Sequence, residues 1–261
     1  MIRLVHLLKR KPGLSQAAFT SYWRDVHGPH VAACQTRLDI VRYVQTHRDP
    51  AGQDLDLAAG QARGGTQPPY DGLAEFWWKS EAALAVALTS EAGRIAQAAL
   101  IDDEKEFIDL PASPLWLAHE YPQVNTTVQR IVARPKTGVM KLNFAFHQVP
   151  KLSAAEAQSY WLTTHGPLIR SHSAARGLLA YNQVHRYDSA RADLLRNARG
   201  TAVAPYLGHA EAWFDRLAPR TGPETDDAKT AALADEQNFI DWARSTIIVG
   251  KELVFVDRDW S

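Results

Sequence analysis

The sequence has little cysteine, no excess of charge and no long hydrophobic run, and each absence excludes a class of protein. Cys34 is the one cysteine among 261 residues, which excludes an internal disulfide and a multi-thiolate metal site. Basic and acidic residues both number 29, so no net charge favours nucleic acid or an acidic membrane. No apolar run approaches the about 18 residues of a membrane span. The start, MIRLVHLLKRKPG, becomes charged too early for a signal peptide, and we expect a soluble cytoplasmic protein.

Motifs for common cofactors are also missing. The sequence contains no CxxCH, GxGxxG, P-loop or GxSxG run, so nothing indicates c-type haem, a dinucleotide, ATP or a serine hydrolase. The closest histidine pair, His27 and His30, straddles a proline, and we predict no metal site. We likewise predict no cofactor, although one histidine would suffice as an axial ligand of haem.

The most informative feature that is present is an internal repeat. The segment IRLVHLLKRKPGLSQAAFTSYWRDVHGPHV from Ile2 aligns without a gap with MKLNFAFHQVPKLSAAEAQSYWLTTHGPLI from Met140. Later matches in the same order pair Tyr43-x-Gln45-x-His47 with Tyr181-x-Gln183-x-His185, Pro69-Tyr70-x-Gly72 with Pro205-Tyr206-x-Gly208, and Asp103-Glu104 with Asp235-Glu236. The chain therefore contains two copies of one unit.

Each copy has the order β-α-β-β-α-β, which is the ferredoxin-like motif. Apolar periodicity predicts the strands of the two copies at 2–9, 39–48, 73–79 and 114–121, and at 139–148, 178–187, 207–214 and 247–256. Helices are expected at 15–26, 80–99 and, as a short turn, 102–108, then at 153–165 and 226–243, with a long loop at 50–70.

The sheet of one such copy leaves a face uncovered, and two sheets packed face to face would cover each other. We therefore expect an α+β protein in which two ferredoxin-like repeats form an intramolecular pseudo-dimeric α/β barrel with helices outside. The repeats are predicted at 1–121 and 139–261, separated by a linker at about 122–138.

The first helix of each copy carries the most distinctive motif. Ser15 is the expected N-cap. Gly28-Pro29 is expected to break or kink the helix just after His27. The apolar face at helical spacing consists of Phe19, Tyr22, Trp23 and Val26.

The run LLKRKPGLSQAAFTSYWRDVHGPHV, with the later PPYDGLAEFWWKS, resembles EthD-type domains of the dimeric α/β-barrel superfamily. The resemblance covers nearly the whole chain, twice. It implies that the usual two-chain barrel is fused here into one chain, with a ligand cavity bounded by the sheet and a histidine at the position of His27 and His165. Lactone isomerases, polyketide cyclases and dehydratases, cofactor-free oxygenases and haem proteins share this fold, so the fold does not settle the chemistry.

His27 and His165 are the first candidates for chemistry. A histidine beside a Gly-Pro pair is held at a defined place, and a pKa of about 6.5 allows proton transfer near neutrality. The alternative is a histidine that caps a carbonyl at the broken helix end. Because His30 of the first copy is Leu168 in the second, and Asp71 is Leu207, one of the two cavities could be only structural.

Three polar residues alternate along the second strand of each copy and therefore share one face. They are Tyr43, Gln45 and His47, and in the second copy Tyr181, Gln183 and His185. Such a polar face is unexpected under helices, so it predicts either a wet ligand cavity or a solvent-exposed surface.

A carboxylate and a tryptophan share one face of the third strand, as Glu75 with Trp77 and as Glu211 with Trp213. Desolvation beside the indole would raise the pKa of the carboxyl and suit it to acid or base catalysis. The alternative is an ion pair across the sheet with an arginine of the second strand, Arg48 or Arg186.

Tyrosines and loop arginines complete the candidates. Tyr22 and Tyr160 could donate to a developing oxyanion, or they could be core residues. The long loops at 49–71 and 188–205 are typical of lids. Their arginines could receive an anionic group or remain solvated: Arg48, Arg63, Arg186, Arg191, Arg196 and Arg199.

Together these patterns predict a cofactor-independent acid/base enzyme, a dehydratase (lyase), isomerase or cyclase, for a small, apolar, oxygenated substrate of aromatic, lactone or polyketide-like type. The expected catalytic residues are His27, His165, Tyr22, Tyr160, Glu75 and Glu211. The expected substrate-binding residues are Trp23, Trp161, Tyr43, Gln45, His47, Tyr181, Gln183, His185, Trp77, Trp213, Tyr70 and Tyr206.

Two alternatives stay open. One is a non-catalytic binding or accessory protein of a catabolic pathway, and the other is an oxygenase or haem-dependent enzyme. The expected partner is a small-molecule substrate, with no nucleic acid and no membrane, and the expected assembly is a monomer or a weak homodimer.

Overall fold

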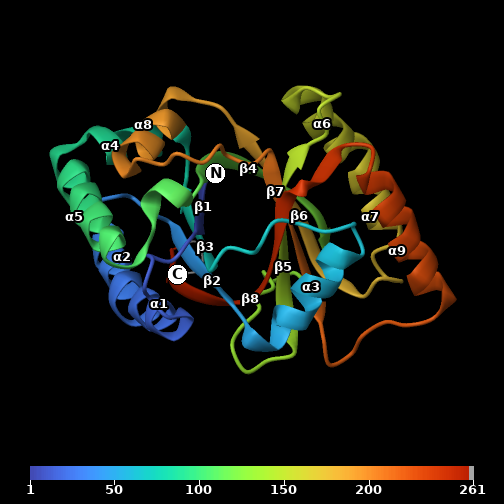
Figure 1. The fold of residues 1–261 in the computed structure, drawn as a ribbon. Helices are drawn as coiled ribbons and strands as arrows, with labels where there is room; N and C mark the ends of the chain where they lie inside the picture. The colour runs from blue at the N-terminus through green and yellow to red at the C-terminus, as the bar shows by residue number, and fades with distance from the viewer. Residues whose placement is uncertain (259–261) are drawn as a thin grey trace.

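The computed structural model describes residues 1–258, and its centre is a closed barrel of eight strands (Figure 1). The order around the barrel is β1-β3-β2-β8-β5-β7-β6-β4, and every neighbouring pair is antiparallel. The strands are Ile2–Leu8 (β1), Arg42–Arg48 (β2), Gly72–Trp78 (β3), Leu115–Asn125 (β4), Val139–Gln148 (β5), Leu178–Tyr187 (β6), Gly208–Asp215 (β7) and Ile240–Asp257 (β8).

Two ferredoxin-like repeats build this barrel, which confirms the predicted fold. Within the repeats the strands are ordered β4-β1-β3-β2 and β8-β5-β7-β6. The repeats join at two seams, where β2 pairs with β8 and β4 with β6. Strand β1 therefore lies opposite β5, and β3 opposite β7, around a pseudo-twofold axis. The division into units at 1–121 and 139–261 stays a prediction, because the seams close both repeats into one barrel.

The helices lie outside the barrel in two groups (Figure 1). The first repeat contributes α1 (Gln16–Tyr22), α2 (Gly28–Cys34), α4 (Glu81–Thr89) and α5 (Glu91–Phe107), and the second α6 (Ala154–Tyr160), α7 (Gly166–Ser171) and α9 (Pro223–Glu236). Ser15 caps α1 as predicted. Among the described residues, no single helix is long and apolar enough to cross a membrane; α4 and α5 would pass such a test only as a pair, bent by 81°.

The two long loops contain helices, which the sequence did not predict, and each helix crosses to the other repeat. α3 (Gln53–Gln61) follows β2, and its Ala59 packs against the core of the second repeat. α8 (Ala190–Arg199) follows β6, and its Leu195 belongs to the core of the first repeat. In Figure 1, α8 lies in orange beside α4 and α5, whereas α3 lies in light blue on the side of α7 and α9. Each repeat is thus covered by a helix from the other.

The Gly28-Pro29 pair does not break the first helix, which corrects the expectation of a break. A five-residue π-helical turn, Trp23–His27, leads directly into α2, and Trp161–His165 does the same before α7. The proline is tolerated because it lies in the first turn of α2. The π-turn contains one residue more than a regular helical turn. The side chain that points towards the sheet is therefore that of His27, which is 2% exposed, and not that of Val26, which is 47% exposed.

The polar faces of β2 and β6 are buried beneath these turns, so the expected solvent-exposed surface is wrong. Gln45 Nε2 donates to the Trp23 carbonyl at 2.9 Å, and Gln183 Nε2 donates to the Trp161 carbonyl at 2.8 Å. His47 packs on the Trp23 ring, as His185 does on Trp161. The glutamines satisfy a carbonyl of each π-turn, so these residues hold the turn in place.

The glycine of the repeated Pro-Tyr-x-Gly motif leaves room on the sheet for the tryptophan side chain of each π-turn. A Cβ atom on Gly72 would lie 2.3 Å from Cζ3 of Trp23. A Cβ atom on Gly208 would lie 3.1 Å from Cζ3 of Trp161 and 2.2 Å from the Val184 carbonyl oxygen. Glycine therefore allows the indole to pack directly against the strand backbone.

Candidate functional site

A histidine, an aspartate and a tyrosine form a hydrogen-bonded triad in the second repeat. His165 Nδ1 lies 2.7 Å from Asp235 Oδ2, and the Tyr160 hydroxyl donates to Asp235 Oδ1 over 2.6 Å. An Nδ1–H that donates to a carboxylate fixes the tautomer and leaves the lone pair on Nε2. Tyr160 was expected to face a substrate oxyanion, and instead it orients Asp235. The repeat of Asp103-Glu104 as Asp235-Glu236 is the one feature of the sequence that points to Asp235, and the sequence alone gives this residue no role.

The surroundings keep the His165 imidazole neutral. The residue is 4% exposed, and burial lowers the pKa of His165, although the hydrogen bond to Asp235 acts in the opposite direction. Burial and the Asp235 carboxylate both raise the pKa of Tyr160, so its hydroxyl stays protonated and can donate. A neutral imidazole with a free Nε2 is a competent general base.

His165 borders a narrow cavity between the outer face of the sheet and the helices. Its volume is about 30 Å³, enough for a water molecule. Its other lining residues include Arg63, Phe144, Trp161, Arg176, Tyr181, Glu236 and Trp242. Of the substrate-binding residues expected from sequence, Trp161 and Tyr181 therefore lie at this cavity.

A loop arginine from the first repeat closes this cavity. Arg63 Nε lies 2.8 Å from Glu236 Oε2, and both side chains are 8% exposed. The Arg63 guanidinium also packs on the rings of Phe144 and Trp242, at 4.9 and 4.7 Å. The expected solvated loop charge is thus wrong for Arg63, which fastens α3 over the second repeat.

A second arginine of the cavity has a free guanidinium. Arg176 lines the cavity next to His165, and its side chain makes no hydrogen bond or ion pair within residues 1–258. Burial lowers the pKa of Arg176, and nearby Glu236 acts in the opposite direction. A guanidinium without a partner at this place can bind an oxyanion or a carboxylate.

The first repeat has the same triad, but its cavity has neither the arginine nor the histidine that line the cavity of the second repeat. His27 Nδ1 lies 2.6 Å from Asp103 Oδ2, and the Tyr22 hydroxyl donates to Asp103 over 2.7 Å. Its cavity of about 40 Å³ is lined by Leu38 at the position of Arg176, and no histidine lines it. The two repeats have therefore diverged, as the exchange of His30 for Leu168 suggested.

In the first repeat an arginine of the crossing helix α8 also forms a buried ion pair. Arg199 of α8 lies 2.7 Å from Glu104 of α5, and both side chains are nearly buried. Arg199, like Arg63, is therefore not a solvated loop charge. Among the other loop arginines, Arg48 pairs with Asp56 at 3.0 Å and Arg186 with Asp188 at 3.2 Å.

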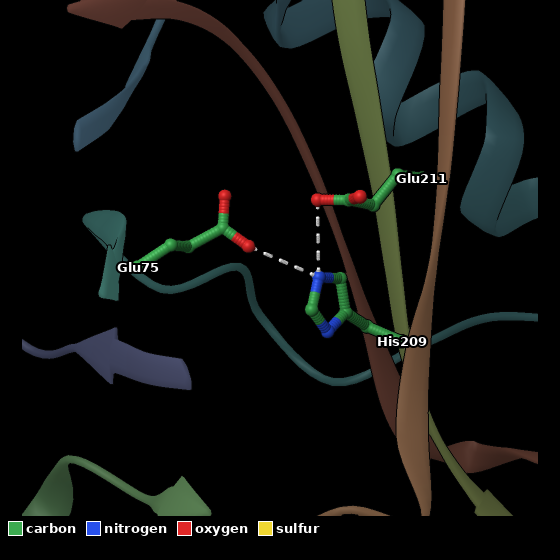
Figure 2. Close-up of side chains that lie close together, drawn as sticks. All are labelled: Glu75, His209 and Glu211. Atoms are coloured by element: carbon green, nitrogen blue, oxygen red, sulfur yellow. Dashed lines mark hydrogen bonds and ion pairs between the residues drawn. The ribbon is translucent and has the colours of Figure 1, made fainter. Parts of the chain in front are cut away.

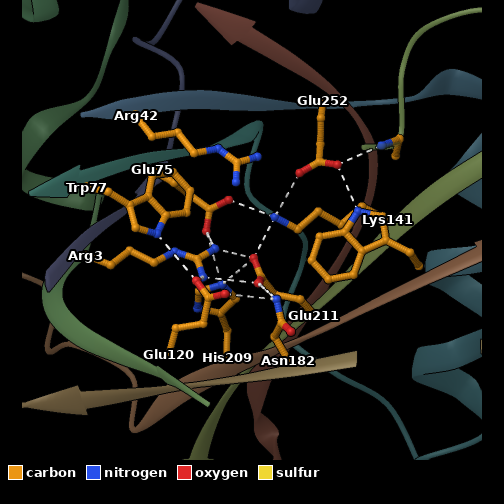
Figure 3. A network of polar contacts seen from close by, with 12 residues as sticks. Arg3, Arg42, Glu75, Trp77, Glu120, Lys141, Asn182, His209, Glu211 and Glu252 are labelled. Carbon is orange, nitrogen blue, oxygen red and sulfur yellow. Dashed lines mark hydrogen bonds and ion pairs between the residues drawn. The ribbon is translucent and has the colours of Figure 1, made fainter. Parts of the chain in front are cut away.

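Glu75 and Glu211 lie inside the barrel, in a charged network that also contains His209 (Figure 3). His27 and His165 lie on the other side of the sheet, beneath the helices. Glu211 of β7 pairs with Arg3 of β1, and Lys141 of β5 pairs with Glu75 of β3 at 2.8 Å. These strands are not neighbours, so the contacts cross the barrel interior. The predicted partners Arg48 and Arg186 are wrong, and one shared site for these glutamates and the histidines is wrong as well.

The expected rise in the carboxyl pKa is also wrong. Burial alone would raise the pKa of Glu75, but Arg3 and Lys141 outweigh it and hold the pKa at about 2. The same two cations hold the pKa of Glu211 well below its ordinary value. Both carboxylates stay ionised, and Trp77 and Trp213 pack against the cations, Arg3 and Lys141 respectively.

Three residues of this network have a spacing that resembles a metal site. Side-chain ligand atoms of Glu75, His209 and Glu211 lie within 4.8 Å of one another, and His209 Nε2 is 3.4 Å from one oxygen of each glutamate (Figure 2). The same carboxylates already bind Arg3 and Lys141. A divalent cation would lie beside two fixed positive charges, so the cluster does not fit a metal ion.

Tyr70 and Tyr206 lie apart from both sites. Their rings are 6.3 Å apart and border an open cavity of about 450 Å³ that also includes Lys9, His147 and Arg244. Tyr206 packs on Trp116 within the apolar part of the barrel interior. The residues expected to bind one substrate are thus distributed over four places: beneath each of the two π-turns, in the charged network and at this open cavity.

A haem group does not fit the histidine cavity. Ligand pockets for molecules of drug size or larger have about 300–1,000 Å³, whereas the space beside His165 is about 30 Å³. Arg63 and the two rings on which it packs, Phe144 and Trp242, line this space together with His165.

Comparison with protein families gives one match, to the EthD domain, at residues 11–111 and 149–243. No curated protein matches the sequence. Similar solved structures include a monooxygenase-like protein from Fusobacterium nucleatum, with 7% identity, TM-score 0.49 and coverage of 97% of this chain and 92% of the other. A dye-decolorizing peroxidase from Bacteroides thetaiotaomicron has 8% identity, TM-score 0.49 and coverage of 95% and 92%. A monooxygenase-like protein from Lactobacillus acidophilus has 7% identity, TM-score 0.46 and coverage of 98% and 96%.

Proposed function

The chain belongs to the EthD domain family, and we propose that it is an enzyme in which neutral His165 moves a proton on a small oxygenated substrate. The observation that supports this proposal is the His165–Asp235 pair at a cavity that also holds the free guanidinium of Arg176. The second repeat is the proposed active one, because the first has Leu38 in place of that arginine.

The proposed chemistry is proton abstraction next to a carbonyl group, followed by return of the proton. His165 Nε2 takes the proton, and the Asp235 carboxylate stabilises the imidazolium that forms. Arg176 binds the enolate oxygen that develops on the substrate. Return of the proton to another atom gives an isomerase, and loss of a hydroxyl group assisted by the imidazolium gives a dehydratase. A positioned general base contributes about 10²–10⁴-fold to the rate of such steps.

The substrate must enter by displacement of α3. The cavity is too small for an organic molecule while Arg63 pairs with Glu236, and these two residues belong to different repeats. Opening of this ion pair lets the loop between β2 and β3 act as a lid. We further propose that one chain is the working unit, because a single chain closes the whole barrel.

Proton exchange with solvent tests this function directly. A panel of lactones, β-hydroxy ketones and cyclic enones is incubated with the protein in D₂O, and deuterium at carbon is followed by NMR. Wild-type protein is expected to label a panel member, and His165→Ala is expected to lose at least 100-fold of that rate. His27→Ala is the matched control and should retain the rate. Labelling that survives in His165→Ala would exclude the proposed base.

A further inference from the structure

The barrel interior contains a second cavity, at the end where the charged network lies. Its volume is about 280 Å³, and it is separate from the cavity beside His165. The linker between the repeats borders it through Val128, Arg130 and Ile131. Barrels of eight strands have interiors that are either filled by side chains or hold one small ligand. A cavity of this volume is close to the size of small-ligand pockets.

The carboxylates at this cavity already have partners. Glu211 binds Arg3 and Lys141, and Glu120 lies 3.1 Å from Arg3. Glu252 accepts from the Trp213 indole at 2.9 Å and lies 3.3 Å from Lys141. Among the described residues, Arg3 and Lys141 are therefore the Lys and Arg side chains with which these carboxylates pair.

Arg42 is a third cation at this cavity. It is 6% exposed, it lines the cavity, and its side chain makes no hydrogen bond within residues 1–258. The nearest carboxylate oxygen, Asp257 Oδ2, is 3.9 Å from its Nε. In Figure 3 its guanidinium lies above Glu75 and Trp77 with no dashed line to the network. A buried guanidinium without hydrogen bonds costs folding free energy, which a bound anion would offset.

Arg130 of the linker presents a second such group to the same cavity. Its Nη1 atom is buried without a hydrogen-bond partner in the described chain. Arg42 and Arg130 line the same cavity, and burial and the charge of Arg130 both lower the pKa of Arg42. A guanidinium can bind a carboxylate through two parallel hydrogen bonds, so both arginines offer donors that suit this group.

The opposite wall of the cavity is apolar. At the constant repeat offset, the counterpart of Arg42 is Ala180, which also lines the cavity. Val124, Ile131 and Trp213 extend this apolar wall. The pseudo-symmetry is therefore broken such that one side of the cavity suits an anionic group and the other a compact apolar group.

We propose that this barrel-end cavity binds a small organic carboxylate, with the carboxylate between Arg42 and Arg130 and an apolar group towards Ala180 and Trp213. This site is independent of the proton-transfer chemistry at His165, because the wall of the barrel separates the two.

Benzoate is the probe that tests this site. Calorimetry and tryptophan fluorescence are expected to show one benzoate per chain, since Trp77 and Trp213 line the cavity. Arg42→Gln and Arg130→Gln are each expected to weaken binding at least tenfold. Arg134→Gln, on the exposed part of the same linker, is the matched control and should bind as the wild type does. Benzyl alcohol, which has the same ring without the charge, should bind at least tenfold more weakly.

The proposal would be overturned if the wild type bound no benzoate at millimolar concentration in at least 20-fold excess. Unchanged affinity of Arg42→Gln for benzoate would also overturn it. So would inorganic phosphate that binds as tightly as benzoate. Loss of binding in His165→Ala would place benzoate in the other cavity and would also contradict it. Benzoate should raise the Tm of the wild type and should not raise the Tm of Arg42→Gln.

Discussion

Asp235 holds His165 with Oδ2 2.7 Å from Nδ1, in a pocket where the imidazole is almost fully buried. The contact depends on the π-turn, because a regular helix would direct Thr164, the counterpart of Val26, inward and place His165 nearer the surface. The turn is in turn held by Gln183 of β6, which satisfies the Trp161 carbonyl. The geometry of the proposed base therefore depends on residues of both the helix and the sheet.

Replacement of Asp235 by asparagine should lower turnover by about 10²–10⁴-fold, because the amide no longer fixes the Nδ1–H tautomer or stabilises the imidazolium. The carboxylate also acts to raise the pKa of His165. Its removal should therefore move the acidic limb of the pH–rate profile to lower pH. Asp103→Asn, the equivalent change in the first repeat, should leave the rate unchanged. Equal losses in both variants would contradict the assignment to the second repeat.

The pH dependence of the wild type follows from the lowered pKa of His165. The base must be neutral, so kcat/KM should fall as the pH decreases through a value below the ordinary 6.5. For stability the sign is the same: the unfolded chain binds the proton more readily, so this group destabilises the folded protein as the pH falls below about 6.5. A rate profile with its acidic limb above pH 7 would be inconsistent with this environment.

Arg176→Leu makes the second cavity resemble the first, which has Leu38 at this position. We expect kcat/KM to fall by about 10- to 100-fold, the loss of one charge-assisted hydrogen bond of about 1.5–3 kcal/mol. The rate of the variant should recover in part with added guanidinium ion. Arg170→Leu, an exposed arginine of α7, serves as the control. An unaffected Arg176→Leu would remove this residue from the mechanism.

Arg63→Ala should open the cover of the active repeat. The ion pair with Glu236 and the packing on Phe144 and Trp242 are lost together. Limited proteolysis within 49–71 should become several-fold faster, while cleavage within 188–205 should not change. Arg199→Ala should show the reverse pattern, because Arg199 pairs with Glu104 in the other cover. Identical cleavage patterns in the two variants would contradict the crossed arrangement.

The charged network of the barrel should govern acid stability. Glu211→Gln leaves Arg3 and Lys141 buried with one carboxylate fewer, which should lower the free energy of unfolding by about 3–5 kcal/mol. In the wild type the pKa of Glu75 is about 2 against the ordinary 4.5. Its contribution is therefore complete above about pH 4.5 and is lost as the pH falls towards 2. Urea denaturation between pH 6 and pH 2 measures both effects.

Much of the fold follows from the repeated pattern, because periodicity and turn residues fix the strands and two half-covered sheets cover each other. The π-turn could not be predicted, since the spacing of Phe19, Tyr22, Trp23 and Val26 fits a regular helix. Only tertiary contacts, such as those of Gln45, favour the wider turn over that regular spacing.

The candidate site was only partly predictable for the same reason. His165 and Trp161 follow from a local motif, whereas Arg63 and Arg176 reach the cavity from a crossed loop and from the segment before β6. Glu75 and Trp77 share a strand face as expected, but alternation alone does not say whether that face points towards helices or into a barrel. The cations that set the Glu75 pKa, Arg3 and Lys141, come from strands far apart in the sequence.

The most direct measurement is ¹⁵N NMR of histidine-labelled protein, with His165 assigned by comparison with His165→Gln. The account predicts a neutral imidazole at pH 7, with the proton on Nδ1, the lone pair on Nε2 and a titration below pH 6.5. An imidazolium at pH 7, or a neutral ring with its proton on Nε2, would contradict the assignment of His165 as the base.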